Sequence, residues 1–269
     1  FTRAKNVSHT MMMNMMVFCI GAVGYFATGF AFQFGGVNFT WPAVNGLSEW
    51  AHSPITLGSW VDAAGNALLA TPLIAIGQHG ILGGSGFFLM GLGGSTGILA
   101  FFLFQMVFMD TAATIPTGSM AERLKFTGFI AMGLWVSMFI YPMVGGWVWG
   151  GGWLQNLGRS LGLGNGAVDF AGSGVVHTIG GAVALAGAIV IGPRIGRFNK
   201  DGSANAIPGH NIPMGVLGTI ILFFGWFGFN PGSSLGFTGA FRELAITAAV
   251  NTLLAGAAGG IAAMFYMWW

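Results

Sequence analysis

Six long apolar stretches constrain this chain more than any other feature. They occupy residues 11–34, 97–121, 127–149, 173–193, 211–230 and 244–267. The hydrocarbon core of a bilayer is about 30 Å thick and needs roughly 20 apolar residues per helix. Each stretch reaches that length. The sequence therefore predicts an all-α polytopic membrane protein whose helices are these six stretches.

The scarcity of charge excludes the other protein classes. Only 9 Lys and Arg and 7 Asp and Glu occur among 269 residues, or 6%, whereas about a quarter of an ordinary soluble domain is charged. Disordered chains are poor in aromatic residues, but 14% of this chain is aromatic. The 48 glycines follow no three-residue period, which excludes collagen. A lone cysteine, Cys19, permits no disulfide within the chain.

The basic residues set the expected orientation. Two of the nine, Arg159 and Arg242, fall on one side of the apolar stretches, and seven fall on the other: Arg3, Lys5, Arg123, Lys125, Arg194, Arg197 and Lys200. Because Lys and Arg concentrate in cytoplasmic loops, both ends of the chain are expected in the cytoplasm, with the protein in the plasma (inner) membrane. The basic residues do not gather on one soluble face, so no nucleic-acid partner is expected.

Residues 36–96 are expected to form a long external loop with re-entrant pieces. The apolar part of this region, residues 67–77, is too short to span a bilayer and contains Pro72. The part that follows, residues 80–94, is interrupted by glycines. Neither part predicts a seventh transmembrane helix.

Ionisable groups inside a transmembrane helix are expensive and usually functional, and three fall in or beside these stretches: Asp110, Asp169 and His177. The low dielectric favours a neutral imidazole at His177. Such a ring offers one donor and one acceptor, so it can line a narrow path for a small polar molecule. A hydrogen bond to a neighbouring helix explains His177 equally well.

The acidic residues have simpler explanations. Asp169 begins the helix that contains the fourth stretch, where aspartate is a favoured helix cap, so a structural role is the better interpretation. Its field could also favour a cation on the external side. Asp110 has no assigned role. Glu122 and Arg123 adjoin the cytoplasmic end of the second stretch, where a mutual ion pair or a helix cap is expected.

Several aromatic residues lie where an incoming cation would meet them. Phe104 and Phe108 are four residues apart and share a helix face, while Trp149 and Phe229 lie near the external ends of their stretches. A cation–π contact contributes up to about 2 kcal/mol, which is far less than the dehydration cost of an ion. A path with these features suits a neutral molecule derived from a cation, as ammonia is from ammonium.

Several motifs resemble the ammonium transporter (Amt/Mep/Rh) family. They are DFAGSGVVH at 169–177, FQMVF at 104–108 with the residues that follow to 126, GWFGFNPGS at 225–233, WVWGGG at 147–152 and HNIP at 210–213. The resemblance covers nearly the whole chain outside residues 37–85. It implies the ammonium-transporter fold of eleven helices in two inverted halves, assembled as homotrimers with a pore in each subunit. This chain would hold about the second to the seventh helix, without the second pore histidine.

The resemblance also implies a transport site. Phe108, Trp149 and Ser233 would recruit ammonium, or its analogue methylammonium, at the external face. Phe108 and Phe229 would form a stacked gate below that site. The ion would lose its proton there, and ammonia would pass through.

Four further residues would complete the path. Phe104 and Trp226 would support the aromatic vestibule. His177 would be one half of a pore histidine pair, and Asp169 would be structural or would assist proton release. No cofactor is implied, and no spacing of His, Cys, Asp or Glu resembles a metal site.

Three other functions account for some of these features. An ammonium-sensing membrane domain coupled to a cytoplasmic signalling module would share the same motifs. An intramembrane enzyme is disfavoured, because Asp169 and His177 are about 12 Å apart along a helix and no nucleophile is paired with a base. A structural scaffold would explain the glycines, but not a buried histidine among aromatic residues.

Overall fold

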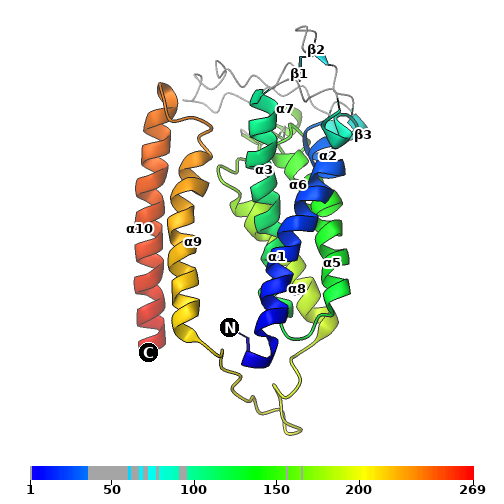
Figure 1. Ribbon diagram of the computed structural model, residues 1–269. Helices are drawn as coiled ribbons and strands as arrows, with labels where there is room; N and C mark the ends of the chain where they lie inside the picture. Colours follow the sequence, from blue (N-terminus) through cyan, green and yellow to red (C-terminus); the bar gives the residue numbers. More distant parts are fainter. Residues whose placement is uncertain are drawn as a thin grey trace. The chain divides into compact units, whose positions relative to one another are not determined.

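The computed structural model describes residues 2–35, 60–61, 67–68, 72–76, 79–90, 96–155, 157–164 and 166–269. The chain divides into two compact units, a first unit of residues 2–208 and a second unit of residues 209–269. The described residues include six helices long and apolar enough to cross a membrane: Ala4–Phe34, Ile98–Met120, Phe126–Val148, Ser173–Ile191, Ile212–Gly232 and Phe241–Trp268 (Figure 1).

The first of these helices begins before its apolar stretch. A short 3₁₀ turn, η1 (Ala4–Asn6), leads into α1 (Val7–Gly24), η2 (Tyr25–Gly29) and α2 (Phe30–Phe34). The predicted stretch started at residue 11. Helical hydrogen bonds require only the backbone, so polar residues at the membrane surface extend the helix beyond the apolar region.

The second and third helices are each built from several segments. α3 (Thr96–Thr114) is followed by α4 (Pro116–Met120), and α5 (Phe126–Trp135) continues through η5 (Val136–Ile140) into α6 (Tyr141–Val148). Pro116 and Pro142 lie in the first turns of α4 and α6. A proline is tolerated there because the missing N–H would have no helical partner.

Three of the helices contain a wide turn with hydrogen bonds from residue i+5 to residue i. The N–H of Phe30 bonds to Tyr25 in the first, and the N–H of Tyr141 bonds to Val136 in the third. In the fourth, His177 bonds to the carbonyl of Gly172. Such π-type turns are rare and occur frequently at functional sites.

The fourth helix packs closely on the second. After α7 (Leu157–Leu161), the helix consists of η6 (Ser173–Thr178) and α8 (Ile179–Ile191). A Cβ on Gly187 would lie 2.4 Å from Met120 Sδ, and a Cβ on Gly180 would lie 2.6 Å from Ile115. The glycines therefore allow the two helices to approach more closely than any side chain would permit.

Short strands occur in the region expected to be a long external loop. β1 (Trp60–Val61) pairs antiparallel with β2 (Ala67–Leu68), and β3 (Pro72–Ile76) pairs antiparallel with β4 (His79–Gly83). A 3₁₀ turn, η4 (Phe87–Leu89), follows. These strands were not predicted from the sequence. Most of the predicted 36–96 loop lies outside the described residues.

The second unit consists of α9 (Ile212–Gly232) and α10 (Ala240–Trp268), which run antiparallel and side by side (Figure 1). The side chain of Asn211 caps α9 by accepting a hydrogen bond from the N–H of Met214 at 3.0 Å. Asn230 donates to the Thr252 hydroxyl at 3.0 Å and joins the two helices. This inter-helix bond satisfies polar groups that would be costly in an apolar environment.

Candidate functional site

Three predicted aromatic residues come together in the first unit. The rings of Phe104 and Phe108 are 4.5 Å apart between centroids, and the ring of Phe108 meets that of Trp149 edge to face at 5.9 Å. Phe108 and Trp149 are buried. α3 supplies the two phenylalanines, and the tryptophan caps the end of α6. The cluster offers aromatic faces and edges at the junction of two helices.

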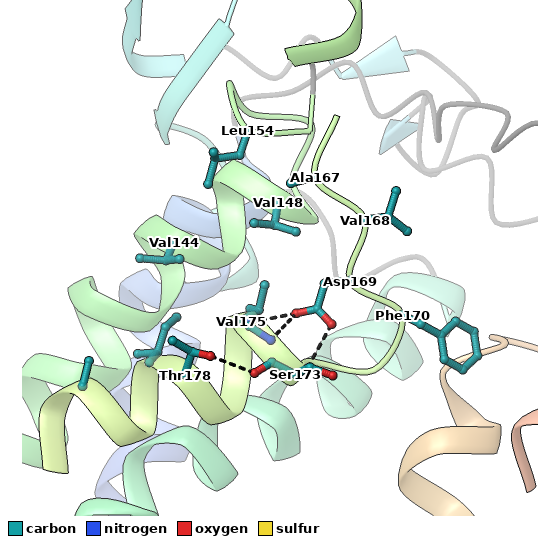
Figure 2. Close-up of a pocket in the computed structure, with 13 residues that line it drawn as sticks. Val144, Val148, Leu154, Ala167, Val168, Asp169, Phe170, Ser173, Val175 and Thr178 are labelled. Carbon is teal, nitrogen blue, oxygen red and sulfur yellow. Dashed lines mark hydrogen bonds between the residues drawn. The ribbon is translucent and has the colours of Figure 1, made fainter. Parts of the chain in front are cut away.

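The carboxylate of Asp169 organises the start of the fourth helix. Oδ1 accepts hydrogen bonds from the backbone N–H groups of Gly172 and Ser173 at 2.8 and 2.9 Å. Oδ2 accepts from Gly174 and Val175 at 2.9 and 2.8 Å (Figure 2). These are the N–H groups that a helix start leaves without backbone partners, so the carboxylate acts as a helix cap.

A hydrogen bond connects this turn to the aromatic cluster. Trp149 donates its indole N–H to the carbonyl of Asp169 at 2.6 Å. Gly172, which precedes the helix, has a φ of +95°, and a Cβ there would lie 2.4 Å from Val176 and 3.2 Å from the Trp149 ring. Only glycine fits this left-handed, crowded position. The turn therefore fixes the tryptophan against Phe108.

His177 lies one turn into the same helix and is half-buried. Its Nδ1 is 3.2 Å from the carbonyl oxygen of Gly172. Because a carbonyl can only accept, this hydrogen bond places a proton on Nδ1, which leaves Nε2 as the acceptor when the ring is neutral. A histidine held in this way can accept a hydrogen bond from a small polar molecule.

A pocket of about 500 Å³ lies on another side of this turn (Figure 2). Val144 and Val148 line it from α6, and Val175 and Thr178 line it from η6. Asp169 borders it, but Phe108, Trp149 and His177 do not. The pocket is mostly apolar, and the Asp169 carboxylate beside it already accepts four hydrogen bonds. It therefore does not coincide with the predicted site.

The remaining predicted site residues lie on α9, or directly after it, in the second unit. Ser233 is buried and donates its hydroxyl to the carbonyl of Phe229 at 2.9 Å. Trp226 lies on α9 one turn before Phe229 and is 36% exposed. Their association with Phe108 and Trp149 stays a prediction.

Asp110 does not join the aromatic cluster. Its Oδ1 is buried, and among the described residues it has no hydrogen-bond partner. A Cβ on Gly21 of α1 would lie 4.0 Å from this oxygen, so the carboxyl group faces the first helix. Within the described ranges, no group of three His, Cys, Asp or Glu residues could hold a metal ion.

Comparison with known proteins decides the family. The sequence model of the protein family described as Ammonium Transporter Family matches residues 1–269 of this chain. The chain belongs to the ammonium transporter family. It is therefore an integral multi-pass membrane protein with the all-helical fold of that family, which is a family of transporters and not of enzymes.

Individual relatives agree with this assignment. Ammonium transporter Amt2 of Archaeoglobus fulgidus is 42% identical, over 100% of this chain and 48% of its own length. Ammonium transporter 1 member 3 of Solanum lycopersicum is 36% identical, over 98% of this chain and 50% of its own length. The chain thus spans about half the length of these relatives.

Solved structures of related proteins share the fold. One named Sensor Amt Protein has a TM-score of 0.75 at 34% identity, covering 100% of this chain and 56% of its own. The crystal structure of Candida albicans Mep2 has a TM-score of 0.65 at 27% identity. The match covers 94% of this chain and 46% of the Mep2 chain. The structural likeness extends over almost the whole chain.

Two features of the site were missed by the sequence analysis. The carbonyl of Gly172 accepts from the backbone N–H groups of Val176 and His177, both at 2.9 Å, and also contacts the His177 ring. The indole bond from Trp149 to Asp169 was likewise not predicted. The glycine three residues after the capping aspartate could have indicated the Gly172 turn. The bond from Trp149 to Asp169 joins residues twenty apart, so the local sequence contains no signal for it.

Proposed function

We propose that the full-length protein transports ammonium across the membrane. In this proposal, NH4+ binds at an external aromatic vestibule formed by Phe108, Trp149 and Ser233. It then loses its proton, and NH3 passes the Phe108 and Phe229 gate and reaches His177. The observation that carries the proposal is the contact between Phe108 and Trp149 in a chain of this family. The hydrogen bond from Trp149 to Asp169 connects this contact to the turn that bears His177.

The chemistry of the described residues supports this order of events. Ring faces attract a cation without the cost of bringing a counter-charge into the membrane. They cannot replace the hydration of an ion that travels further, so deprotonation must precede passage. Nε2 of His177 can accept a hydrogen bond from NH3, which is neutral and has three N–H groups.

Phe104 and Trp226 act in this proposal as supports of the vestibule. Asp169 has a structural role, because its two oxygens already accept four backbone hydrogen bonds. A proton could be taken up by this carboxylate only if some of those bonds were lost. Proton release is therefore assigned to the solvent side of the vestibule.

Uptake of methylammonium by the full-length protein in vesicles tests the proposal. Replacing Trp149 by Leu should raise the half-saturation concentration about tenfold, since the cation–π contact contributes up to about 2 kcal/mol. His177→Asp should lower the maximal rate with a smaller effect on half-saturation, because His177 lies beyond the recruitment site.

Trp153→Leu is the matched control, because Trp153 contacts Trp147, with 5.6 Å between ring centroids, and is not part of the predicted site. It should leave both kinetic constants within about twofold of the wild type. Unchanged uptake by folded Trp149→Leu and His177→Asp proteins would contradict the assigned roles. Absence of uptake by the folded wild-type protein would contradict the function itself.

The setting of the transporter belongs to the same proposal. The seven-to-two division of basic residues supports a cytoplasmic location for both ends of this chain. We propose that the membrane is the plasma (inner) membrane and, from the family resemblance, that the protein is a homotrimer. The structural relative named Sensor Amt Protein has the membrane fold that transport and sensing would share, so it does not favour a sensor. Labelling of single introduced cysteines from each side of the membrane tests the orientation. The native mass of the full-length protein in detergent tests whether it assembles as a trimer.

A further inference from the structure

A second fully bonded carboxylate lies at the opposite end of the first unit. Glu122 follows α4, and its side chain has no exposed surface. It accepts the backbone N–H of Arg3 at 2.7 Å and the guanidinium Nε of Arg3 at 3.1 and 3.2 Å. A second guanidinium, that of Arg194, reaches the same carboxylate at 3.3 Å. The proposed transport mechanism does not use this group.

The backbone of Glu122 is also unusual. Its φ is +68°, in the left-handed region that residues with a side chain rarely adopt. Such a conformation persists where surrounding contacts over-determine it, and it is found preferentially at functional sites. The two arginines supply these contacts by holding the carboxylate in place.

The carboxylate joins three segments that are distant in sequence. Arg3 precedes α1, Glu122 follows the second helix, and Arg194 follows α8. Neighbouring contacts reinforce the link between the second and fourth helices: Arg123 donates to the carbonyl of Gly192, and Ser119 donates to that of Ala184 at 3.1 Å.

These two helices carry the residues on which the proposed function depends. α3 bears Phe104 and Phe108, and the helix that ends in α8 begins with the turn bearing His177. His177 is about 20 Å along the helix from Ile191 at its end. A change of spacing at the Glu122 end would therefore tilt the helix and shift His177 relative to Phe108.

We propose that Glu122 is a positioning residue for transport. By binding Arg3 and Arg194, it sets the spacing of the second and fourth helices at the end of the path opposite the vestibule. This inference rests on the proposed function. It goes further by assigning a role to a residue that touches neither the substrate nor the gate.

The consequence is a separation of kinetic constants. Recruitment depends on Phe108 and Trp149, which are held by the Asp169 turn at the other end, so half-saturation should not respond to Glu122. The maximal rate should respond, since it depends on where His177 lies. Coupling of this kind typically changes a rate by about threefold to tenfold.

The experiment uses the full-length protein with a cysteine pair, Ser119→Cys and Ala184→Cys, in a background without other cysteines. The rate of disulfide formation reports the helix spacing independently of transport. Glu122→Gln should slow cross-linking, and should lower the maximal methylammonium uptake per folded protein by about threefold to tenfold with half-saturation within about twofold of wild type.

Two further variants separate positioning from simple loss of folding. Glu122→Asp should recover part of the rate, because it restores the charge. Asp201→Asn removes a carboxylate from an exposed loop at the same end and should change neither readout. If Glu122→Gln does not fold, Arg194→Gln leaves the Arg3 bonds in place and carries the same test, with a smaller expected loss.

The outcomes discriminate between the claims. Cross-linking that does not respond to Glu122→Gln would overturn the inference, as would slower cross-linking with an unchanged maximal rate. If the folded wild-type protein shows no uptake while cross-linking still depends on Glu122, the proposed function fails and the inference fails only in its link to transport.

Discussion

Asp169 and Glu122 are carboxylates at opposite ends of the first unit, and they differ in how far away in the sequence their hydrogen-bond donors lie. Asp169 accepts four backbone N–H groups from residues three to six positions ahead. Glu122 accepts from Arg3 and Arg194, which are 119 and 72 residues away. One carboxylate folds a local turn, whereas the other holds together segments that the local sequence does not connect.

The difference determines what each group can contribute. Backbone donors cannot move without unwinding the turn, so Asp169 fixes local geometry, here the position of Trp149 and of the His177 turn. Besides the backbone N–H of Arg3, the donors to Glu122 include arginine side chains, which can detach while their helices stay folded. Glu122 can therefore change the spacing between helices without changing any one of them.

Replacing Asp169 by Ala should have the largest effect, because it leaves four backbone N–H groups without their acceptor. Two of these groups, on Gly172 and Val175, are partly buried. Because an unsatisfied buried group costs about 1 kcal/mol or more, the free energy of unfolding should fall by about 2 kcal/mol or more. Uptake should be lost with it. The thermal midpoint of the full-length protein in detergent, measured beside uptake, checks both effects.

Asp169→Asn sharpens the comparison, because it keeps one acceptor oxygen and removes the charge. We expect an intermediate loss, since the amide NH2 group would face N–H donors and repel them. An Asn variant as stable as the wild type would contradict the view that both oxygens are needed.

Glu122→Gln should have the second largest effect. The side chains of Arg3 and Arg194 are 35% and 27% exposed. The loss should therefore be about 2 kcal/mol, below that for a fully buried pair. The same thermal measurement, made against pH, adds an independent check.

Burial by itself would raise the pKa of Glu122, but the hydrogen bonds of Arg3, a hydrogen bond from the Asn6 side chain and the charge of Arg3 outweigh it and lower the pKa from 4.5 to about 2. A lowered pKa means that the folded state favours the charged form. The stabilisation is therefore complete above pH 4.5 and is lost as the pH falls toward 2. The stability difference between wild type and Glu122→Gln should stay constant from pH 7 to 5 and shrink below that. A difference that shrank between pH 7 and 6 would show that another group is titrating.

The same contrast explains what the sequence could predict. Apolar stretches of about 20 residues indicate helices without any knowledge of partners, and a capping aspartate is recognisable because its donors follow within one turn. Glu122 was expected to pair with Arg123 or to cap a helix. That expectation was wrong, because its partners are Arg3 and Arg194, and only the packed fold brings residues so distant in sequence together.

The wide turns and the short strands were also beyond the sequence analysis. An i+5 hydrogen bond leaves no change in apolar periodicity long enough to detect. β3 (Pro72–Ile76) and β4 (His79–Gly83) are brief, and their region was predicted to form re-entrant pieces of a long external loop. The association of Ser233 and Phe229 with Phe108 stays a prediction from resemblance.

Gly180→Ala should have a smaller effect and tests the spacing from another side. The added methyl group would lie 2.6 Å from the Ile115 side chain, and overpacking of this kind costs about 1 to 2 kcal/mol. Gly181→Ala is the matched control, since a Cβ there meets nothing within 4 Å. If the two variants had equal thermal midpoints, the contact between the second and fourth helices would not be as close as described.

Asp201→Asn should have the smallest effect, and it tests whether charge alone explains Glu122. The Asp201 carboxylate accepts hydrogen bonds from the hydroxyl and the N–H of Ser203 at 2.6 and 2.9 Å, and these bonds lower its pKa. The residue is exposed, however, and its partner is two positions away. We expect the thermal midpoint to change by no more than about 1 °C. A loss equal to that of Glu122→Gln would mean that any carboxylate at this end stabilises the basic surface through its field. A negligible loss would mean that Glu122 acts through burial and through the distant segments it joins.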